Sequence, residues 1–230
     1  MDALLKKFAE TFEGHIYRHR SSTKGDKIAE FLYEDLVELG RSPKLLRRVS
    51  AGDVVINTGN KVTGRVGRRG DGTFGERVPS VDPVVVSGYS VRRGLIAEAQ
   101  ITAEFKIVGT KQTAQIGRVL TALKDQADVF AKLNPLAIRV AFVGVNHADK
   151  YVGHEGDRQY VAKAPPSKTA ADITQRLDEF IRPLYDELLI LPYKATNEPP
   201  YPFTWVNESS SKAEYSSALV RISNQYEQRF

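Results

Sequence analysis

Two residues of opposite charge, Glu104 and Lys106, are separated by a single residue in the segment LIAEAQITAEFKIV, residues 95–108. The segment alternates between an apolar set and a set with a polar middle, which is the period of a β-strand. Side chains two apart on a strand project from the same face, about 6.5 Å apart. The pattern therefore predicts a carboxylate and an amine side by side on one face of a sheet.

A further carboxylate, Asp82, directly precedes a short apolar run at residues 84–86. If that run and the 95–108 segment pair as neighbouring strands, Asp82 and Glu104 converge on one spot. Two converging carboxylates at an open rim are oxygen ligands of the kind that Mg²⁺ binds. The metal polarises a phosphoryl oxygen and lowers the pKa of a bound water, and a lysine stabilises charge that develops on the phosphate. Such a site could hydrolyse a phosphodiester.

Each of these residues also has a plain structural interpretation. Glu104 and Lys106 could form an ion pair on a solvated strand face, which contributes under about 1 kcal/mol. Asp82 could simply open a turn before the proline that follows it. Asp71 and Asp53 are alternative sources of the second carboxylate.

The elements that must position these residues are indicated by hydrophobic periodicity. Apolar stripes at helical spacing predict helices at residues 2–13, 26–39, 111–132, 168–189 (kinked at Pro183) and 212–226. Short apolar runs predict strands at residues 52–57, 84–86, 95–108 and 137–145. A helix between the third strand and a buried fourth strand implies a mixed α/β sheet with helices on its faces.

The order helix, strand, strand, strand, helix, strand over residues 26–145 resembles the PD-(D/E)XK superfamily of nucleases, to which restriction endonucleases and Holliday-junction resolvases belong. The motif that carries the resemblance is Asp82 followed by Glu104-Phe105-Lys106 near the end of the third strand. The resemblance implies a restriction-endonuclease-like αβββαβ core. It assigns Asp82, Glu104 and the Phe105 carbonyl as metal ligands and Lys106 as the catalytic lysine.

The predicted helix at residues 26–39 adds to the resemblance. It opens on the run Lys24-Gly25-Asp26, and Glu30 follows inside it. This is similar to the first helix of many such nucleases, in which an acid leans toward the metal. The resemblance implies Glu30 for that role, with Glu34 one turn later as a substitute. We expect one nuclease-like domain over residues 1–230, with its core at about 26–145 and a helical C-terminal extension at about 166–230.

Residues 59–77 form a glycine- and arginine-rich segment, GNKVTGRVGRRGDGTFGER, which predicts a mobile loop or a long hairpin. Arg65, Arg68 and Arg69 in it are suited to contacts with DNA phosphates, because glycine lets the backbone follow a groove. The net charge of +5 and the pI of about 9.3 also favour a polyanionic partner.

Composition excludes several classes of function. The chain of 230 residues holds no cysteine, which excludes disulfides, zinc–thiolate sites and thiol nucleophiles. It carries no phosphate-binding Gly-x-x-x-x-Gly-Lys-Ser/Thr loop and no dinucleotide fingerprint, so we expect no nucleotide cofactor. No apolar run approaches the roughly 20 residues of a membrane span, and residues 1–13 lack the layout of a signal peptide. We therefore expect a cytoplasmic protein with no membrane association.

The sequence thus favours a magnesium-dependent DNA endonuclease, with Mn²⁺ as a possible substitute. Its size and the absence of an ATPase motif suit a type II restriction enzyme that acts on double-stranded DNA as a homodimer. An alternative is a non-catalytic DNA-binding or assembly protein that retains the nuclease fold. A third possibility is an unrelated α/β interaction protein in which the polar strip merely faces water.

Overall fold

The computed structural model describes residues 1–18, 23–57, 61–62, 65–66, 70–109, 112–155, 158–162 and 164–230. The main sheet consists of β1 (Val54–Asn57), β4 (Gly72–Arg77), β5 (Arg93–Gly94), β6 (Ile96–Val108), β7 (Ile138–Asn146), β10 (Glu187–Ala195) and β11 (Phe203–Trp205). The helices are α1 (Ala3–Glu10), α2 (Thr23–Leu39), α3 (Pro43–Ala51), α4 (Gln112–Leu133), α5 (Ala170–Phe180) and α6 (Glu208–Arg229). The smaller elements are the hairpins β2 (Lys61–Val62) with β3 (Arg65–Val66) and β8 (Val152–Glu155) with β9 (Arg158–Val161), and the 3₁₀ turns η1 (Pro166–Lys168) and η2 (Arg182–Leu184).

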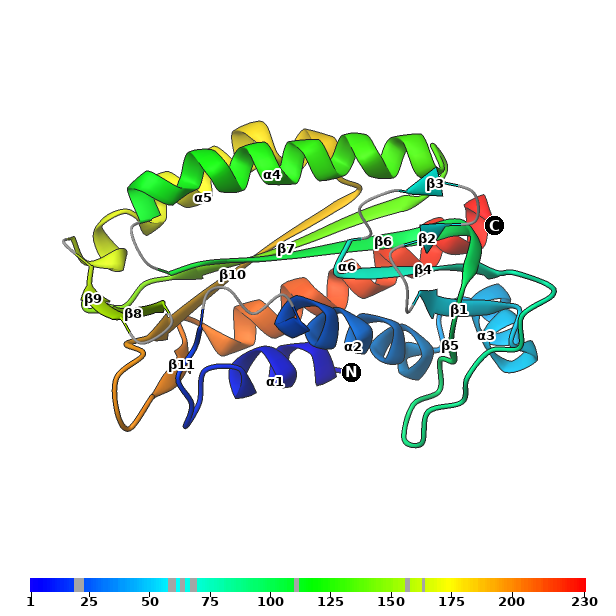
Figure 1. The fold of residues 1–230 in the computed structure, drawn as a ribbon, viewed down its shortest axis with the longest axis horizontal. Coiled ribbons are helices and arrows are strands. Elements are labelled where there is room, and N and C mark those ends of the chain that lie inside the picture. The colour runs from blue at the N-terminus through cyan, green and yellow to red at the C-terminus, as the bar shows by residue number, and fades with distance from the viewer. Residues whose placement is uncertain are drawn as a thin grey trace.

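The seven strands of the main sheet lie in the order β11-β10-β7-β6-β4-β1-β5, with helices on both faces (Figure 1). Strands β1, β4 and β6 are successively antiparallel, whereas β6, β7 and β10 are parallel. Taken in chain order, α2, β1, β4, β6, α4 and β7 form a helix, three antiparallel strands, a helix and a parallel strand. The predicted mixed α/β sheet with flanking helices is therefore confirmed.

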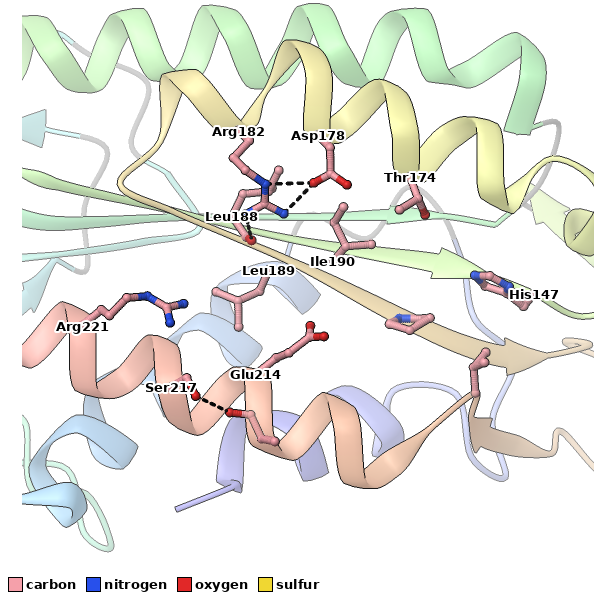
Figure 2. Close-up of a pocket in the computed structure, with 13 residues that line it drawn as sticks. His147, Thr174, Asp178, Arg182, Leu188, Leu189, Ile190, Glu214, Ser217 and Arg221 are labelled. Carbon is pink, nitrogen blue, oxygen red and sulfur yellow. Dashed lines mark hydrogen bonds and ion pairs between the residues drawn. The ribbon is translucent and has the colours of Figure 1, made fainter.

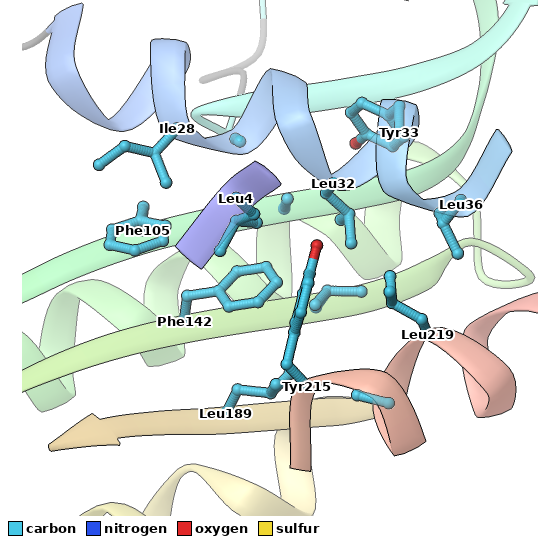
Figure 3. Packing of buried hydrophobic residues seen from close by; sticks show 14 of the residues in the cluster. Leu4, Ile28, Leu32, Tyr33, Leu36, Phe105, Phe142, Leu189, Tyr215 and Leu219 are labelled. Carbon is cyan, nitrogen blue, oxygen red and sulfur yellow. The ribbon is translucent and has the colours of Figure 1, made fainter. Parts of the chain in front are cut away.

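Two hydrophobic cores lie on the two faces of this sheet. On one face, Phe105 of β6 and Phe142 of β7 stack with ring centroids 5.5 Å apart and pack beneath α1, α2 and α6 (Figure 3). On the other face, Val143 and Val145 pack against α4 and α5. Strand β7 is buried on both sides, which explains why residues 137–145 are almost wholly apolar.

The second strand of the antiparallel set does not come from the predicted segment. Residues 84–86 form only an isolated bridge from Val84 to Arg93, and Val84 and Val85 are largely exposed. Instead, β4 arises from the glycine-rich segment that was predicted as a loop or long hairpin. Its glycines permit close packing, since a Cβ atom on Gly75 would lie 1.9 Å from the Glu98 carbonyl oxygen.

Strand β6 also departs from the alternation predicted over residues 95–108. A register shift between Phe74 and Gly75 of β4 disturbs the ladder, so that Gln100 turns inward and accepts a hydrogen bond from the Tyr226 hydroxyl at 2.7 Å. Leu95, predicted on the core side, is exposed. From Ile101 onward the alternation holds, and it places Glu104 and Lys106 on the face opposite Phe105.

The C-terminal third is not only helical. The predicted helix at residues 168–189 is wrong in its second half, because α5 ends at Phe180 and η2 contains Pro183. Residues 187–195 then form β10 beside β7. The run Glu-Leu-Leu-Ile-Leu at 187–191 suits a buried strand as well as a helix, and its tertiary neighbours decide between them. Helix α3, which was not predicted, has a Ser42 cap and ends at Gly52 with φ of 74°.

Candidate active site

Strand β6 loses one neighbour close to Glu104. Strand β4 pairs with β6 only from Gly72, opposite Ala103, to Arg77. Beyond Gly72, residues 104–108 of β6 pair with β7 on one side, and no described strand of the main sheet pairs with them on the other. Glu104, Phe105 and Lys106 therefore lie where an edge of β6 opens.

Asp71 lies at this opening, immediately before β4. Its carboxylate Oδ2 accepts the backbone N–H of Phe105 at 2.7 Å, and its own backbone N–H donates to the Glu104 carboxylate. The N–H and C=O of one residue point to the same edge of a strand, so the Phe105 carbonyl is directed to the edge where Asp71 lies. We call Asp71, Glu104, the Phe105 carbonyl and Lys106 the carboxylate site.

Glycines on three sides allow Asp71 to reach this position. A Cβ atom on Gly25 in the first turns of α2 would lie 2.6 Å from the carboxyl carbon of Asp71. A Cβ atom on Gly70 would lie 2.4 Å from the carbonyl oxygen of Ala103 in β6. With Gly72 on its other side, Asp71 stands in a Gly-Asp-Gly run that brings backbone and carboxylate against both α2 and β6.

Glu104 is a buried acid with few partners. Its side chain is 7% exposed and forms an ion pair with the Lys106 ammonium, which is 30% exposed. Burial raises the pKa of Glu104, and this effect outweighs the opposing effects of Lys106 and the Asp71 amide. The negative charge of Asp26 raises the pKa further. A bound cation would therefore stabilise the charged form of Glu104, and raised carboxyl pKa values of this kind are typical of functional sites.

The acids of α2 are divided between this site and the opposite edge of the sheet. Glu30 accepts a hydrogen bond from Arg93 Nη2 at 3.1 Å, and Glu34 accepts the backbone N–H groups of residues 90 and 91. Both acids therefore anchor β5 and the segment before it. Asp26, one turn earlier, lies within electrostatic range of Glu104. The structure thus places Asp26, and not Glu30, beside the carboxylate site.

The structure does not bring Asp82 to Glu104. Asp82 is exposed in the segment between β4 and β5, two residues before Val84, which pairs with Arg93 of β5. Strands β1 and β4 lie between β5 and β6, and each strand adds about 4.8 Å of separation. Asp71, one of the two alternatives in the sequence, takes the position expected of Asp82.

The other alternative, Asp53, lies at the far end of β4, where its carbonyl oxygen accepts the backbone N–H of Arg77.

The predicted DNA contacts fall mostly outside the described residues. Arg68 and Arg69 lie outside them entirely, and the backbone of Arg65 belongs to β3 in the short β2–β3 hairpin. Only the Gly-Asp-Gly run at the start of β4 could have indicated Asp71 in the sequence.

The candidate ligand atoms at the carboxylate site are two carboxylates and one backbone carbonyl, all hard oxygen donors. Among the described residues, no group of three or more histidine, cysteine, aspartate or glutamate side chains could hold a metal ion. Mg²⁺ is commonly bound through one or two carboxylates with its remaining positions taken by water and phosphate, so the donor types here fit it.

Comparison with known proteins finds no matching family, no similar curated protein and no similar solved structure.

No helix in the described part of the chain has the length and apolar character needed to cross a membrane.

Proposed function

We propose that the protein is a magnesium-dependent DNA endonuclease of the PD-(D/E)XK superfamily, of the type II restriction kind. The observation that carries the proposal is the hydrogen bond from the Phe105 amide to Asp71, which joins a second carboxylate to the Glu104–Lys106 pair. The chain order of α2, β1, β4, β6, α4 and β7 supports it, since it follows the αβββαβ order of that superfamily. The chain resembles that superfamily in the order of its helices and strands and in the residue types of its site.

The residues of the site have distinct roles in this proposal. Asp71, Glu104 and the Phe105 carbonyl would hold Mg²⁺, or Mn²⁺ in its place, which supplies a Lewis acid and a bound water of lowered pKa. Lys106 is more exposed than Glu104 and can donate to a phosphate oxygen, where it stabilises developing negative charge. Asp26 adds negative charge beside the site and favours a cation there.

Double-stranded DNA is the proposed substrate, because the chain has a net charge of +5 and carries arginines in the 59–77 segment. A homodimer would supply two such sites, related by a twofold axis, for the two strands of a duplex. No nucleotide cofactor enters the proposal.

The proposal is tested by incubating Glu104→Ala and Lys106→Ala with plasmid and phage DNA in Mg²⁺ and mapping the ends. We expect the wild type to cut and each variant to lose at least about 100-fold in rate. DNA binding and folding should be retained. Glu76→Ala, which removes an exposed acid from the neighbouring strand β4, is the matched control and should cut normally. Robust magnesium-dependent cutting by either site variant would contradict the proposal.

One observation favours the alternative of a DNA-binding or assembly protein without catalysis. The Glu104 carboxylate already has a cationic partner within the chain, the Lys106 ammonium, so a bound metal is not needed to give it one. This alternative predicts salt-sensitive DNA binding with no cutting in Mg²⁺ or Mn²⁺. An unrelated interaction protein would show neither DNA binding nor a change of melting temperature with Mg²⁺.

A further inference from the structure

A lysine without an acid partner lies at the start of α2. Lys24 is half-buried, and its Nζ lies over the Tyr17 ring, 4.5 Å from the ring centroid. Among the described residues, no carboxylate lies within ion-pair distance of Lys24 or of its neighbour Arg18. Burial lowers the pKa of Lys24, and the positive charge of Arg18 lowers it further. The ammonium is therefore partly withdrawn from water without gaining a negative neighbour.

The arginines of a groove elsewhere in the molecule show the usual alternative. This groove encloses about 710 Å³ between α5 and α6, over β10 (Figure 2). In its lining, Arg182 is paired with Asp178, and Arg221 donates two hydrogen bonds to Glu187 at 2.7 and 2.8 Å. An anion that entered the groove would have to displace these acids. Lys24 has no such acid to displace.

The ring beneath Lys24 is held in place by a buried amide. The side chain of Asn197 accepts the Tyr17 N–H at 2.7 Å and donates to the Tyr17 carbonyl at 3.0 Å. The same amide donates to the carbonyl of Val152, the first residue of β8, at 2.7 Å. The Tyr17 ring also stacks on Phe12, with ring centroids 4.8 Å apart. Because a cation is attracted to the face of a tyrosine ring, this fixed ring holds the Lys24 ammonium in position.

Two observations place Lys24 in the neighbourhood of Asp71. Gly25 follows Lys24 directly, and a Cβ atom on Gly25 would lie 2.6 Å from the Asp71 carboxyl carbon. Burial raises the pKa of Tyr17, and the negative charge of Asp71 raises it further, so the Asp71 carboxylate lies within electrostatic range of the Tyr17 hydroxyl. An unpaired cation therefore lies beside one of the acids of the carboxylate site.

Lys24 and Lys106 approach Asp71 from opposite faces of the sheet. Helix α2 and Tyr17 belong to the core on the Phe105 face, where α2 packs beside Phe105 (Figure 3). Lys106 projects from the other face of β6. A single phosphate does not span two faces of a sheet, so the two lysines are suited to different phosphates.

We propose that Lys24, held over the Tyr17 ring and beside Arg18, binds a DNA phosphate next to the one that is cut. This inference rests on the proposed function, from which it takes the substrate. A phosphate oxygen would accept from the ammonium and supply the negative charge that the two neighbouring cations lack. Arg18 is exposed where its backbone bridges to His154 of β8, and its charge favours the same anion. Lys24 is thus a binding residue that does not touch the reacting atoms.

The salt dependence of DNA binding tests this contact. Binding of the complete chain to a short fluorescent DNA duplex is measured without divalent metal, so that no cutting occurs, over a range of salt concentrations. Each phosphate contact contributes about 0.9 to the slope of log affinity against log salt. Lys24→Gln keeps a polar stem over Tyr17 but removes the charge, so the slope should fall by about 1. If the proteins bind equally at about 1 M salt, this means about tenfold weaker binding at about 0.1 M.

Two further variants serve as controls for the loss of charge. Lys24→Arg restores a cation over the ring and should recover the wild-type slope. Lys27→Gln removes an exposed lysine from the next turn of α2 and should change the slope less than half as much. All three variants should fold, since Lys24→Gln removes a half-buried charge that has no acid partner. A wild-type slope in Lys24→Gln, or an equal fall in Lys27→Gln, overturns the proposal.

Steady-state cutting separates the role of Lys24 from that of Lys106. A flanking phosphate is held in the same way before and during the reaction, so Lys24→Gln should raise KM about as much as it weakens binding. Its kcat should change less than about threefold. Lys106→Ala should instead lose kcat, because Lys106 acts on the charge that develops during cutting. A large loss of kcat in Lys24→Gln with the KM of the wild type would overturn the flanking position.

The phosphate contact and the nuclease proposal fail in different ways. A wild type that cuts DNA, with Lys24→Gln indistinguishable from it in binding and KM, overturns the phosphate contact alone. A wild type whose DNA binding depends on Lys24, but which does not cut in Mg²⁺ or Mn²⁺, overturns the nuclease alone. A wild type that neither binds nor cuts DNA overturns both.

Discussion

Asp186 and Glu104 are both carboxylates that the main sheet withdraws from water, yet their pKa values shift in opposite directions. Burial acts to raise the pKa of Asp186, but hydrogen bonds from Arg229 at 2.6 Å and from the Arg139 amide at 2.8 Å outweigh it and lower the pKa. Burial also raises the pKa of Glu104, and there Lys106 and the Asp71 amide are insufficient to reverse it.

The difference separates a structural acid from a candidate functional one. Asp186 joins β7 and the start of β10 to the last turn of α6, and two arginines held by regular elements match its charge. Glu104 has one flexible lysine and lies beside other acids where β6 has lost a neighbour. A site whose negative charge is only partly balanced in the folded chain is one where a cation gains most on binding.

The largest effect expected is from Asp71. Asp71→Asn should abolish magnesium-dependent cutting, with a loss of at least about 100-fold, because an amide is a poorer ligand for Mg²⁺ than a carboxylate. Asp82→Asn removes the same charge from an exposed segment beyond β1 and β4 and should cut within about twofold of the wild type. Rates on plasmid DNA at saturating Mg²⁺ provide the measurement. Loss of cutting in the Asp82 variant with normal cutting in the Asp71 variant would return the role to Asp82.

A smaller effect is expected when Asp71 is displaced and not replaced. In Gly25→Ala the new methyl group would lie 2.6 Å from the Asp71 carboxyl carbon, so the carboxylate must shift. We expect cutting to fall about 10- to 100-fold, since small misplacements of reacting groups are costly.

Gly117→Ala is the matched control for this substitution. It adds the same methyl group to a helix interior where nothing lies within 4 Å. It should stabilise the protein by about 0.4–1 kcal/mol and leave cutting unchanged. Equal cutting rates for the two alanine variants would show that the position of Asp71 does not matter.

The sequence predicted those elements in which the apolar residues recur at helix or strand spacing and are also the residues that the fold buries. Residues 26–39, 111–132 and 137–145 became α2, α4 and β7 with small shifts of their ends. Strand β4 was missed because glycines supply half of its buried positions, and a residue without a side chain leaves no hydrophobic period. Residues 187–195 were misassigned because their strand neighbours lie far away in the sequence.

The candidate site was predictable in part for the same reason. The strand period alone placed Glu104 and Lys106 on one face, and the structure keeps them there. Which acid lies beside Glu104 depends on which segment pairs with β6, and that pairing is set by tertiary contacts and not by the local sequence. A glycine-rich segment predicts a loop or a long hairpin, which leaves residues 84–86 as the predicted neighbouring strand and favours Asp82 over Asp71 as the second carboxylate.

The comparison between Asp186 and Glu104 gives a last and smaller effect, on stability. A carboxyl whose folded pKa is lowered stabilises the protein above its unfolded pKa, and this stabilisation is lost as the pH falls through the folded pKa. The free energy of unfolding of the wild type should therefore exceed that of Asp186→Asn by about 1–3 kcal/mol at neutral pH, and this difference should shrink below about pH 4.

A carboxyl whose folded pKa is raised, such as that of Glu104, has the opposite effect, because the folded state binds more protons than the unfolded state between the two pKa values. Relative to Glu104→Gln, the wild type should lose stability as the pH rises past about 4.3. Denaturant unfolding of the three proteins in Mg²⁺-free buffer from acid to neutral pH measures both trends. If the stability difference between wild type and variant changed with pH in the same direction for both substitutions, the two acids would not differ in the way proposed.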